Sequence, residues 1–243
     1  YDFIHSGDPA TDAWCDQHVR DEVMMKREDR EHGDWNAFWA ERDYLLDLGP
    51  MKAACLMSHG FNDWNVMPEH STRIFKALEK KGVPVIGYWH QGAHGGPPPF
   101  ELVDKWFTKY LLGIDNGVEK GPRAFIVREG DKPSKPTAYA DWPNPDAANV
   151  VLHPRAGGKK LGELAFTAAA DRARETLVDD VALDGATLAK AEESPTRLLY
   201  ATPVLSKPVH VSGTARVTIT LACDKPATNL SVWLVSLPWT DKA

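Results

Sequence analysis

Two short segments of this 243-residue chain combine an acid, histidines and glycines in a pattern that could support acid–base chemistry. Residues 58–66 (SHGFNDWNV) contain Asp63, and residues 90–97 (HQGAHGGP) contain His94. A carboxylate that accepts a hydrogen bond from an imidazole fixes the tautomer of the ring and stabilises its protonated form. We therefore interpret Asp63 and His94 as a candidate carboxylate–imidazole pair.

Simpler interpretations of the same residues stay open. Asp63 could cap the helix expected to begin near Pro68, because Asp is common just before helices. His94 could be an ordinary polar residue at the rim of a sheet, and His90 and His94, four residues apart, could together bind a metal. A metal site is disfavoured because Gly92 and the prolines oppose a helix and no glutamate follows His90, as in the H-E-x-x-H pattern. We expect no metal site.

The elements around the two segments predict a sheet that would bring Asp63 and His94 together. Apolar strands are expected at 53–57 and 83–89, and amphipathic helices at 68–81 and 100–112. Strands that alternate with helices favour a parallel sheet, in which functional groups gather at the carboxyl ends of the strands. Because consecutive parallel strands are often neighbours, an acid after one strand can meet a histidine after the next.

Regions of different character flank this core. Residues 1–48 are rich in charge and tryptophan, and their periodicity predicts two helices, the second capped by Asp34. After about residue 116, period-two patterns predict a β-sandwich or jelly roll. Its expected strands are 123–127, 150–153, 198–202, 209–211, 215–222 and 229–237. Residues 171–194 are expected to form a surface loop with some helix.

Four stretches carry a resemblance to a known family: 38–44 (FWAERDY), 59–66 (HGFNDWNV), 89–94 (WHQGAH) and 198–205 (LLYATPVL). In them the chain resembles the second half of a Xaa-Pro dipeptidyl-peptidase of serine peptidase family S15, within the cocaine esterase-like α/β-hydrolases. The resemblance covers nearly the whole chain. The H-G-x-N-D-W-N segment is its most diagnostic part and favours the dipeptidyl-peptidases over the esterases.

The resemblance implies a fold in three regions. Residues 1–48 would be a helical cap segment, and 49–115 would be the C-terminal part of the parallel sheet of an α/β-hydrolase core, without its nucleophile half. Residues 116–243 would be a β-sandwich (jelly-roll) domain, truncated at its end. By position in the family, Asp63 looks like the triad acid and His94 like the triad base. His94 is preferred over His90 because the family's histidine lies in the loop beyond the strand, often just before Gly.

A triad of this family also needs a nucleophilic serine in a G-x-S-x-G elbow. None of the serines of this sequence lies in that motif. We therefore expect the chain to be part of a longer protein and to be inactive alone. The activity that the resemblance implies is that of a serine exopeptidase releasing N-terminal Xaa-Pro dipeptides by acyl transfer, which needs no cofactor.

The resemblance also implies partners. The substrate would be a peptide with a penultimate proline, Trp64 and Trp39 would bind it, and the protein would be a homodimer. For Trp39, packing of the cap onto the sheet is the simpler interpretation. Two alternative functions stay open: a cocaine esterase-like acyl ester hydrolase with the same triad, and a non-catalytic binding module built on the β-domain.

Composition argues against several other classes of protein. The formal charge is -6 with no basic block, which disfavours nucleic acid and anionic membranes as partners. No apolar run approaches the roughly 18 residues that span a bilayer. The cysteines, Cys15, Cys55 and Cys223, form neither a disulfide framework nor a zinc cluster. Cytoplasmic and secreted locations both stay open.

Overall fold

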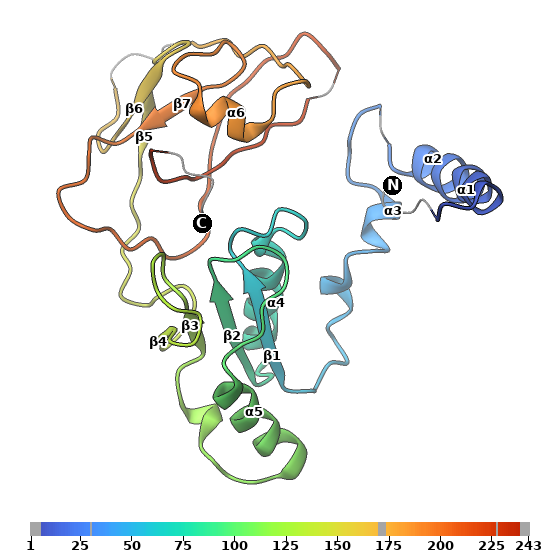
Figure 1. The fold of residues 1–243 in the computed structure, drawn as a ribbon, viewed down its shortest axis with the longest axis vertical. Coiled ribbons are helices and arrows are strands. Elements are labelled where there is room, and N and C mark those ends of the chain that lie inside the picture. The colour runs from blue at the N-terminus through green and yellow to red at the C-terminus, as the bar shows by residue number, and fades with distance from the viewer. Residues whose placement is uncertain (1–5, 30, 170–173, 227, 239–243) are drawn as a thin grey trace. The chain divides into compact units, whose positions relative to one another are not determined.

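The computed structural model describes residues 6–29, 31–169, 174–226 and 228–238 (Figure 1). The chain divides into two compact units. One is drawn from Tyr1–Ala54, Arg73–Pro84 and Arg216–Trp233, and the other from Cys55–Thr72, Val85–Ala215 and Leu234–Ala243. Of the predicted regions, residues 1–5, 30, 170–173, 227 and 239–243 lie outside the described residues.

The first unit begins with a helical run that confirms the first predicted helix. Asp8 caps α1 (Pro9–Cys15) by accepting a hydrogen bond from the Thr11 amide. The run continues through a π-helix (Asp16–Met24) into α2 (Met25–Arg27). Short elements then follow in α3 (Ala37–Ala40) and a 3₁₀ helix (Tyr44–Asp47).

The second helix of this unit starts later than predicted. Asn36, and not Asp34, is the N-cap of α3, because its side chain accepts hydrogen bonds from the amides of Phe38 and Trp39. Asp and Asn both suit this position, so the sequence alone did not separate the two candidates. The prediction of Asp34 as the cap was wrong.

The second unit contains a four-stranded sheet that confirms the predicted parallel arrangement. Its strands, in spatial order, are β1 (Cys55–Gly60), β2 (Val85–His90), β3 (Ala124–Ile126) and β4 (Thr137–Tyr139). The first three are parallel, and β4 runs antiparallel to β3. Figure 1 shows β1 and β2 side by side and pointing the same way. Both strands extend further toward their carboxyl ends than the patterns predicted.

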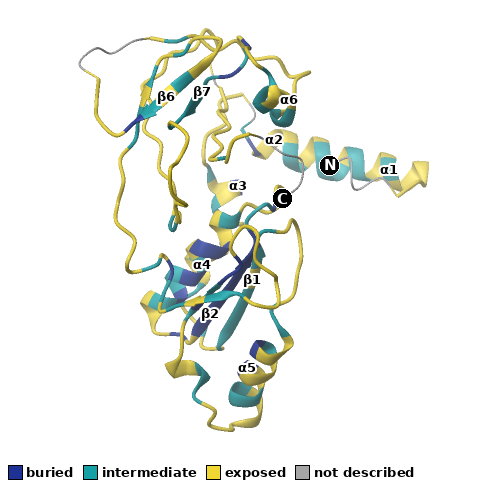
Figure 2. Ribbon diagram, turned by 60° about the vertical axis from the view of Figure 1, so that its left-hand side comes forward, coloured by how far each residue is buried: buried dark blue, intermediate teal, exposed yellow. Residues whose placement is uncertain are grey.

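Strand β2 is the centre of the core, and all of its residues are buried (Figure 2). The indole of Trp89 is fully buried, donates from Nε1 to Ser71 Oγ at 3.1 Å, and lies 5.4 Å from the ring of Trp142. Gly87 has no side chain because that indole crosses its position: an added Cβ would lie 2.1 Å from Trp89 Cη2. A strand covered on both faces explains the continuous apolar run.

Two helices have the predicted bounds. These are α4 (Pro68–Lys81) and α5 (Phe100–Leu112). The amphipathic pattern of α5 buries Leu102 and Trp106, and Gly113 ends the helix at a φ of 70°. The amide of Gly113 donates to Lys109 O, so the left-handed residue closes the last turn. A 3₁₀ turn follows at Val118–Lys120.

The region after residue 116 is only partly as predicted. It contains β5 (His153–Arg155), β6 (Leu161–Ala165), β7 (Leu199–Ala201) and α6 (Gly185–Lys190), and the three strands form one sheet in the order β5-β6-β7. Strand β7 confirms the strand predicted at 198–202, and α6 confirms the helix within 171–194. Strand β3 confirms a strand within 123–127, but it pairs with β2 in the parallel sheet, so its predicted place in a β-sandwich was wrong. The strand predicted at 150–153 instead begins at His153 and runs to Arg155.

The jelly roll is not confirmed. Within the described residues, 209–211, 215–222 and 229–237 form no strand, and those strand predictions were wrong. Val217 and Ile219, on one face of the strictly alternating segment, are 54% and 53% exposed. Alternation specifies which residues share a face, but a strand also needs a neighbour to complete its hydrogen bonds, and period two does not name that neighbour.

A separate finding concerns membranes. In the part of the chain that the structure describes, no helix has both the length and the apolar character needed to cross a bilayer.

The left-handed end of α5 gives a test of the fold. We expect Gly113→Ala to lower the free energy of unfolding by about 1 kcal/mol, because φ near 70° is strained for any residue with a Cβ. A steric clash would not cause this loss of stability, since an added Cβ on Gly113 meets no described atom within 4 Å. Urea unfolding of the natural protein measures the change.

The matched control for this test is Gly121→Ala. Gly121 has a φ of -86°, which alanine adopts freely, and its added Cβ would make only an ordinary contact of 3.5 Å. An equal loss of stability in both variants would contradict the conformational explanation.

Candidate active site

The carboxyl ends of β1 and β2 lie next to each other and carry the two loops that the sequence singled out. The parallel register pairs Gly60 with His90, the last residues of the two strands. Beyond this pair the loops stay in contact, because the Phe61 amide donates to His90 O at 2.7 Å. The side chain of Asn62 donates to Gln91 O at 2.6 Å. Two separate parts of the sequence are therefore held together at one edge of the sheet.

Asp63 and His94 are in contact at this edge. His94 Nδ1 lies 2.9 Å from Asp63 Oδ2, within hydrogen-bond distance. The carboxylate side chain is only 4% exposed, whereas the imidazole side chain is 66% exposed. The structure thus combines a buried acid with an accessible histidine, and an Nδ1–H that donates to Asp63 leaves Nε2 as the proton-accepting nitrogen.

The environment of Asp63 favours its charged form. Its Oδ1 accepts hydrogen bonds from the amides of Val66 at 2.9 Å and Asn65 at 3.0 Å. The Val66 bond is the largest cause that lowers the pKa of Asp63, to about 2, with His94 and Asn65 adding to it and burial opposing. Both amides belong to the loop before Pro68, so these hydrogen bonds of the carboxylate organise that loop rather than α4.

A second histidine contacts the same carboxylate oxygen. His59 Nε2 lies 3.3 Å from Asp63 Oδ2 and 2.8 Å from Val66 O. Its side chain is 10% exposed. Sequence reasoning noted His59 within the motif but gave it no role. Its position at the carboxyl end of β1, four residues before Asp63, was the available signal.

His90 has a different setting. It is 7% exposed, and its Nδ1 accepts a hydrogen bond from the Gly92 amide at 3.0 Å. An added Cβ on Gly96 would lie 2.5 Å from His90 Nε2, so the loop backbone packs directly on this ring. The buried ring of His90 therefore packs against the backbone of the loop, while His94, within that loop, contacts the carboxylate.

The tryptophans predicted to bind substrate, Trp64 and Trp39, do not share the hydrogen bonds of Asp63 and His94 that are described above. Trp64 follows Asp63 directly and is 58% exposed. Trp39 belongs to the other unit, where its Nε1 donates to Glu28 O at 3.2 Å. Ser58 Oγ donates to Gly96 O. Among the described residues, no group of three or more His, Cys, Asp or Glu side chains is arranged to hold a metal ion.

Two family models match the sequence. The model for the X-Pro dipeptidyl-peptidase (S15 family) matches residues 4–96, which include Asp63 and His94. The model for the X-Pro dipeptidyl-peptidase C-terminal non-catalytic domain matches residues 116–240. Of the four strands of the sheet, β1 and β2 lie in the first match and β3 and β4 in the second, and α5 lies between the two matches.

Curated relatives agree with these matches. The chain is 55% identical over 98% of its length to a protein of Rhodopirellula baltica named "Putative Xaa-Pro dipeptidyl-peptidase". It is 32% identical over 91% of its length to a Bacillus anthracis protein of the same name, and 30% identical over 93% to the Xaa-Pro dipeptidyl-peptidase of Lacticaseibacillus rhamnosus. The chain spans 38%, 37% and 29% of the lengths of these three relatives. On these matches, the chain belongs to the X-Pro dipeptidyl-peptidase family S15.

Proposed function

We propose that Asp63 and His94 are the acid and base of a serine exopeptidase that releases N-terminal Xaa-Pro dipeptides. The observation that carries the proposal is the 2.9 Å contact between a buried carboxylate and an exposed imidazole at adjacent strand ends. The name shared by the relatives supports the substrate class, a peptide with a free amine and a penultimate proline.

The proposed mechanism uses the two histidine nitrogens separately. Asp63 Oδ2 accepts a hydrogen bond from Nδ1–H of His94, which leaves Nε2 free of a proton. Nε2 then takes the proton of a serine hydroxyl as the serine oxygen bonds to the carbonyl carbon of proline. Nε2 then gives this proton to the leaving amine as the peptide C–N bond breaks. In deacylation, Nε2 takes a proton from water as the water oxygen bonds to the carbonyl carbon of the acyl-enzyme. It then gives this proton to the serine oxygen as the ester bond breaks, which releases the dipeptide and restores the serine.

The serine of this mechanism must come from residues outside this sequence. None of its serines lies in a G-x-S-x-G elbow. We therefore propose that this chain contributes the acid and base to a longer protein and is inactive alone. The exposure of His94 agrees with this arrangement, because its Nε2 has to reach a hydroxyl and a substrate.

Substrate contacts form a further part of the proposal. Trp64 is the better candidate to pack against the proline ring, since it is exposed and adjacent to Asp63 in sequence. Trp39 stays a second candidate on sequence grounds. The proposed protein is a homodimer, and the mass of the natural protein in solution tests this.

Glycine at the end of β1 is needed to hold His94 in place. An added Cβ on Gly60 would lie 2.2 Å from Gly92 O and 2.3 Å from Ala93 O. These atoms belong to the loop that carries His94, and they are backbone atoms with little freedom to move away. The approach of the two loops, and with it the contact between His94 and Asp63, therefore depends on the absence of a side chain at this position.

The roles of the pair are tested by substitution in the natural full-length protein. We expect Asp63→Asn to lower kcat for cleavage of a Gly-Pro anilide by about 10⁴-fold, because the imidazole is left in the wrong tautomer. We expect His94→Ala to lower it by about 10⁶-fold, because the base is lost. The control is His70→Ala, which removes an exposed imidazole from α4 and should leave kcat unchanged.

Labelling with a fluorophosphonate distinguishes the proposed function from its alternatives. The natural protein should be labelled on one serine and should cleave the anilide. Cleavage of simple acyl esters without cleavage of the anilide would favour the esterase, and absence of both label and cleavage would favour a binding module. Either result would contradict the exopeptidase.

The low pKa of Asp63 gives a pH prediction. A carboxyl whose pKa falls from 3.8 to about 2 on folding stabilises the protein while it is ionised. That contribution is fully present above the ordinary value of 3.8 and is lost as the pH falls toward 2. We expect the difference in unfolding free energy between the natural protein and Asp63→Asn to shrink as the pH is lowered from 4 to 2.5. A difference that stays constant over this range would contradict the assigned pKa.

The loop contact at Gly60 gives a prediction on activity. We expect Gly60→Ala to lower kcat/KM at least about 10-fold, because an added methyl group displaces the loop that positions His94. The control is Gly49→Ala, whose added Cβ meets no described atom within 4 Å. Steady-state kinetics with the Gly-Pro anilide measures both, and equal activity of the two variants would show that the loop contact is not required.

A further inference from the structure

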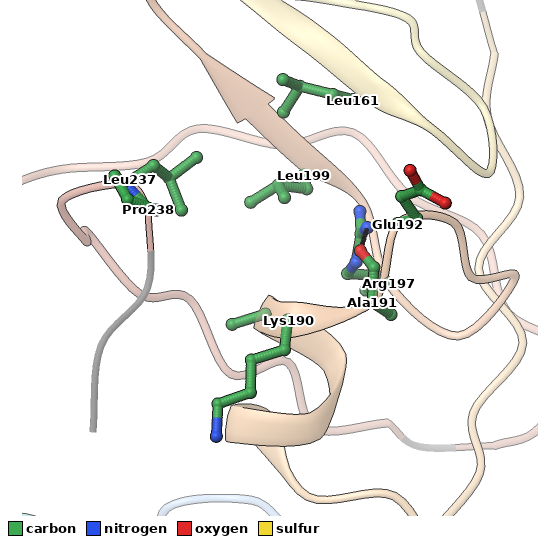
Figure 3. Close-up of a pocket in the computed structure, with 9 residues that line it drawn as sticks. Leu161, Lys190, Ala191, Glu192, Arg197, Leu199, Leu237 and Pro238 are labelled. Carbon is green, nitrogen blue, oxygen red and sulfur yellow. Dashed lines mark hydrogen bonds between the residues drawn. The ribbon is translucent and has the colours of Figure 1, made fainter.

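A depression in the C-terminal region is lined in part by leucine side chains and by Arg197 (Figure 3). Arg197 Nε and Nη1 are buried and have no hydrogen-bond partner among the described residues. These two nitrogens are not accessible from the depression, so they offer a ligand no contact. The buried charge that does lead to an accessible group is Asp63, through His94, and the mechanism above leaves its second histidine, His59, without a role.

His59 is held on a regular element of the sheet. It is the next-to-last residue of β1, where the parallel register pairs it with the fully buried Trp89 of β2. Its side chain is 10% exposed, and its Nε2 lies 2.8 Å from Val66 O. A carbonyl oxygen can only accept a hydrogen bond, so Nε2 carries a hydrogen and donates to it. A strand residue thus anchors the loop that follows the strand.

Val66 connects this anchor to the acid. Its carbonyl oxygen accepts a hydrogen bond from His59, and its amide donates to Asp63 Oδ1 at 2.9 Å. The same amide is the largest cause of the low pKa of Asp63. Movement of Val66 would weaken the hydrogen bond that most favours the charged carboxylate and would free the carboxylate to rotate. His59 therefore acts on Asp63 through one intervening residue.

The two histidines do not compete for the carboxylate. Asp63 Oδ2 lies 2.9 Å from Nδ1 of His94 and 3.3 Å from Nε2 of His59. The hydrogen on Nε2 of His59 goes to the nearer acceptor, Val66 O at 2.8 Å. Oδ2 therefore stays available to accept from His94. Of the two side chains, His94 is 66% exposed and His59 is 10% exposed, so His94 is the one that a substrate can reach.

We propose that His59 is a positioning residue for Asp63. Its Nε2–H anchors the carbonyl of Val66, which holds the Val66 amide on Oδ1 of Asp63 and keeps Oδ2 directed at His94. His59 acts as a hydrogen-bond donor and exchanges no proton with the substrate. This inference rests on the proposed roles of Asp63 and His94 in the peptidase reaction.

Two amide variants at position 59 test the donor. Glutamine places its side-chain amide nitrogen near the position of Nε2, whereas asparagine is one methylene shorter and cannot reach Val66 O. We expect His59→Gln in the natural full-length protein to keep kcat for a Gly-Pro anilide within about threefold of the natural value, because the hydrogen bond is restored. We expect His59→Asn to lower kcat at least about 10-fold with KM changed less than about twofold, because the acid is misdirected while substrate contacts stay in place.

Removal of the donor in two backgrounds tests whether His59 acts through Asp63. We expect His59→Leu to lower kcat at least about 10-fold in the natural protein, but less than about twofold further in Asp63→Asn, where the carboxylate is already lost. The matched control is His70→Leu, the same substitution at an exposed histidine of α4, which should leave kcat unchanged. If His59→Leu gives no cooperative unfolding transition in urea, His59→Asn replaces it in both backgrounds.

Three results would overturn the inference. Equal kcat of His59→Leu and the natural protein would show that the anchor is not required. A kcat of His59→Gln as low as that of His59→Asn would show that the ring itself, and not its N–H, is needed. Equal losses for His59→Leu in the two backgrounds would show that His59 acts independently of Asp63. Failure of the proposed function is a separate result, in which Asp63→Asn and His94→Ala themselves leave kcat unchanged.

Discussion

The buried carboxylate of Asp63 is the interaction on which the candidate site depends. A charge that is 4% exposed has to be balanced by donors, and here two backbone amides and two histidines surround it. The amides of Asn65 and Val66 both donate to Oδ1 of Asp63. These bonds orient the carboxylate, so that Oδ2 is directed toward the imidazoles. The hydrogen bonds that stabilise the buried carboxylate also hold an accessible imidazole beside it.

The sheet makes this balance possible because it brings the two loops to the same edge. Parallel pairing of β1 with β2 places Gly60 beside His90, and the backbone of the second loop then approaches where Gly60 has no side chain. Trp89, one residue before His90, is fully buried and anchors the end of β2 in the core. Rigid strands with functional groups on the loops beyond them are an efficient way to hold reacting groups in a fixed geometry.

Sequence patterns predicted the parts of this chain that local rules determine. The bounds of α4 and α5, and the adjacency of two parallel strands, follow from periodicity, proline and glycine. The contact of His59 with Asp63 depends on side-chain direction at the end of β1, which period two does not give. The choice of Asn36 over Asp34 and the unpaired segment 215–222 depend in the same way on tertiary neighbours.

Asp63 and Arg197 show two different outcomes for a buried charge. The Asp63 carboxylate has protein donors on both oxygens, so the fold stabilises its charged form and fixes its orientation. Arg197 is 8% exposed, and within the described residues its guanidinium has a hydrogen-bond partner for Nη2 only, so Nε and Nη1 retain the cost of lost hydration. A charge balanced by its own protein is suited to orient another residue. A charge without such partners only adds to the cost of folding, because the hydrogen bonds that it made with water are not replaced.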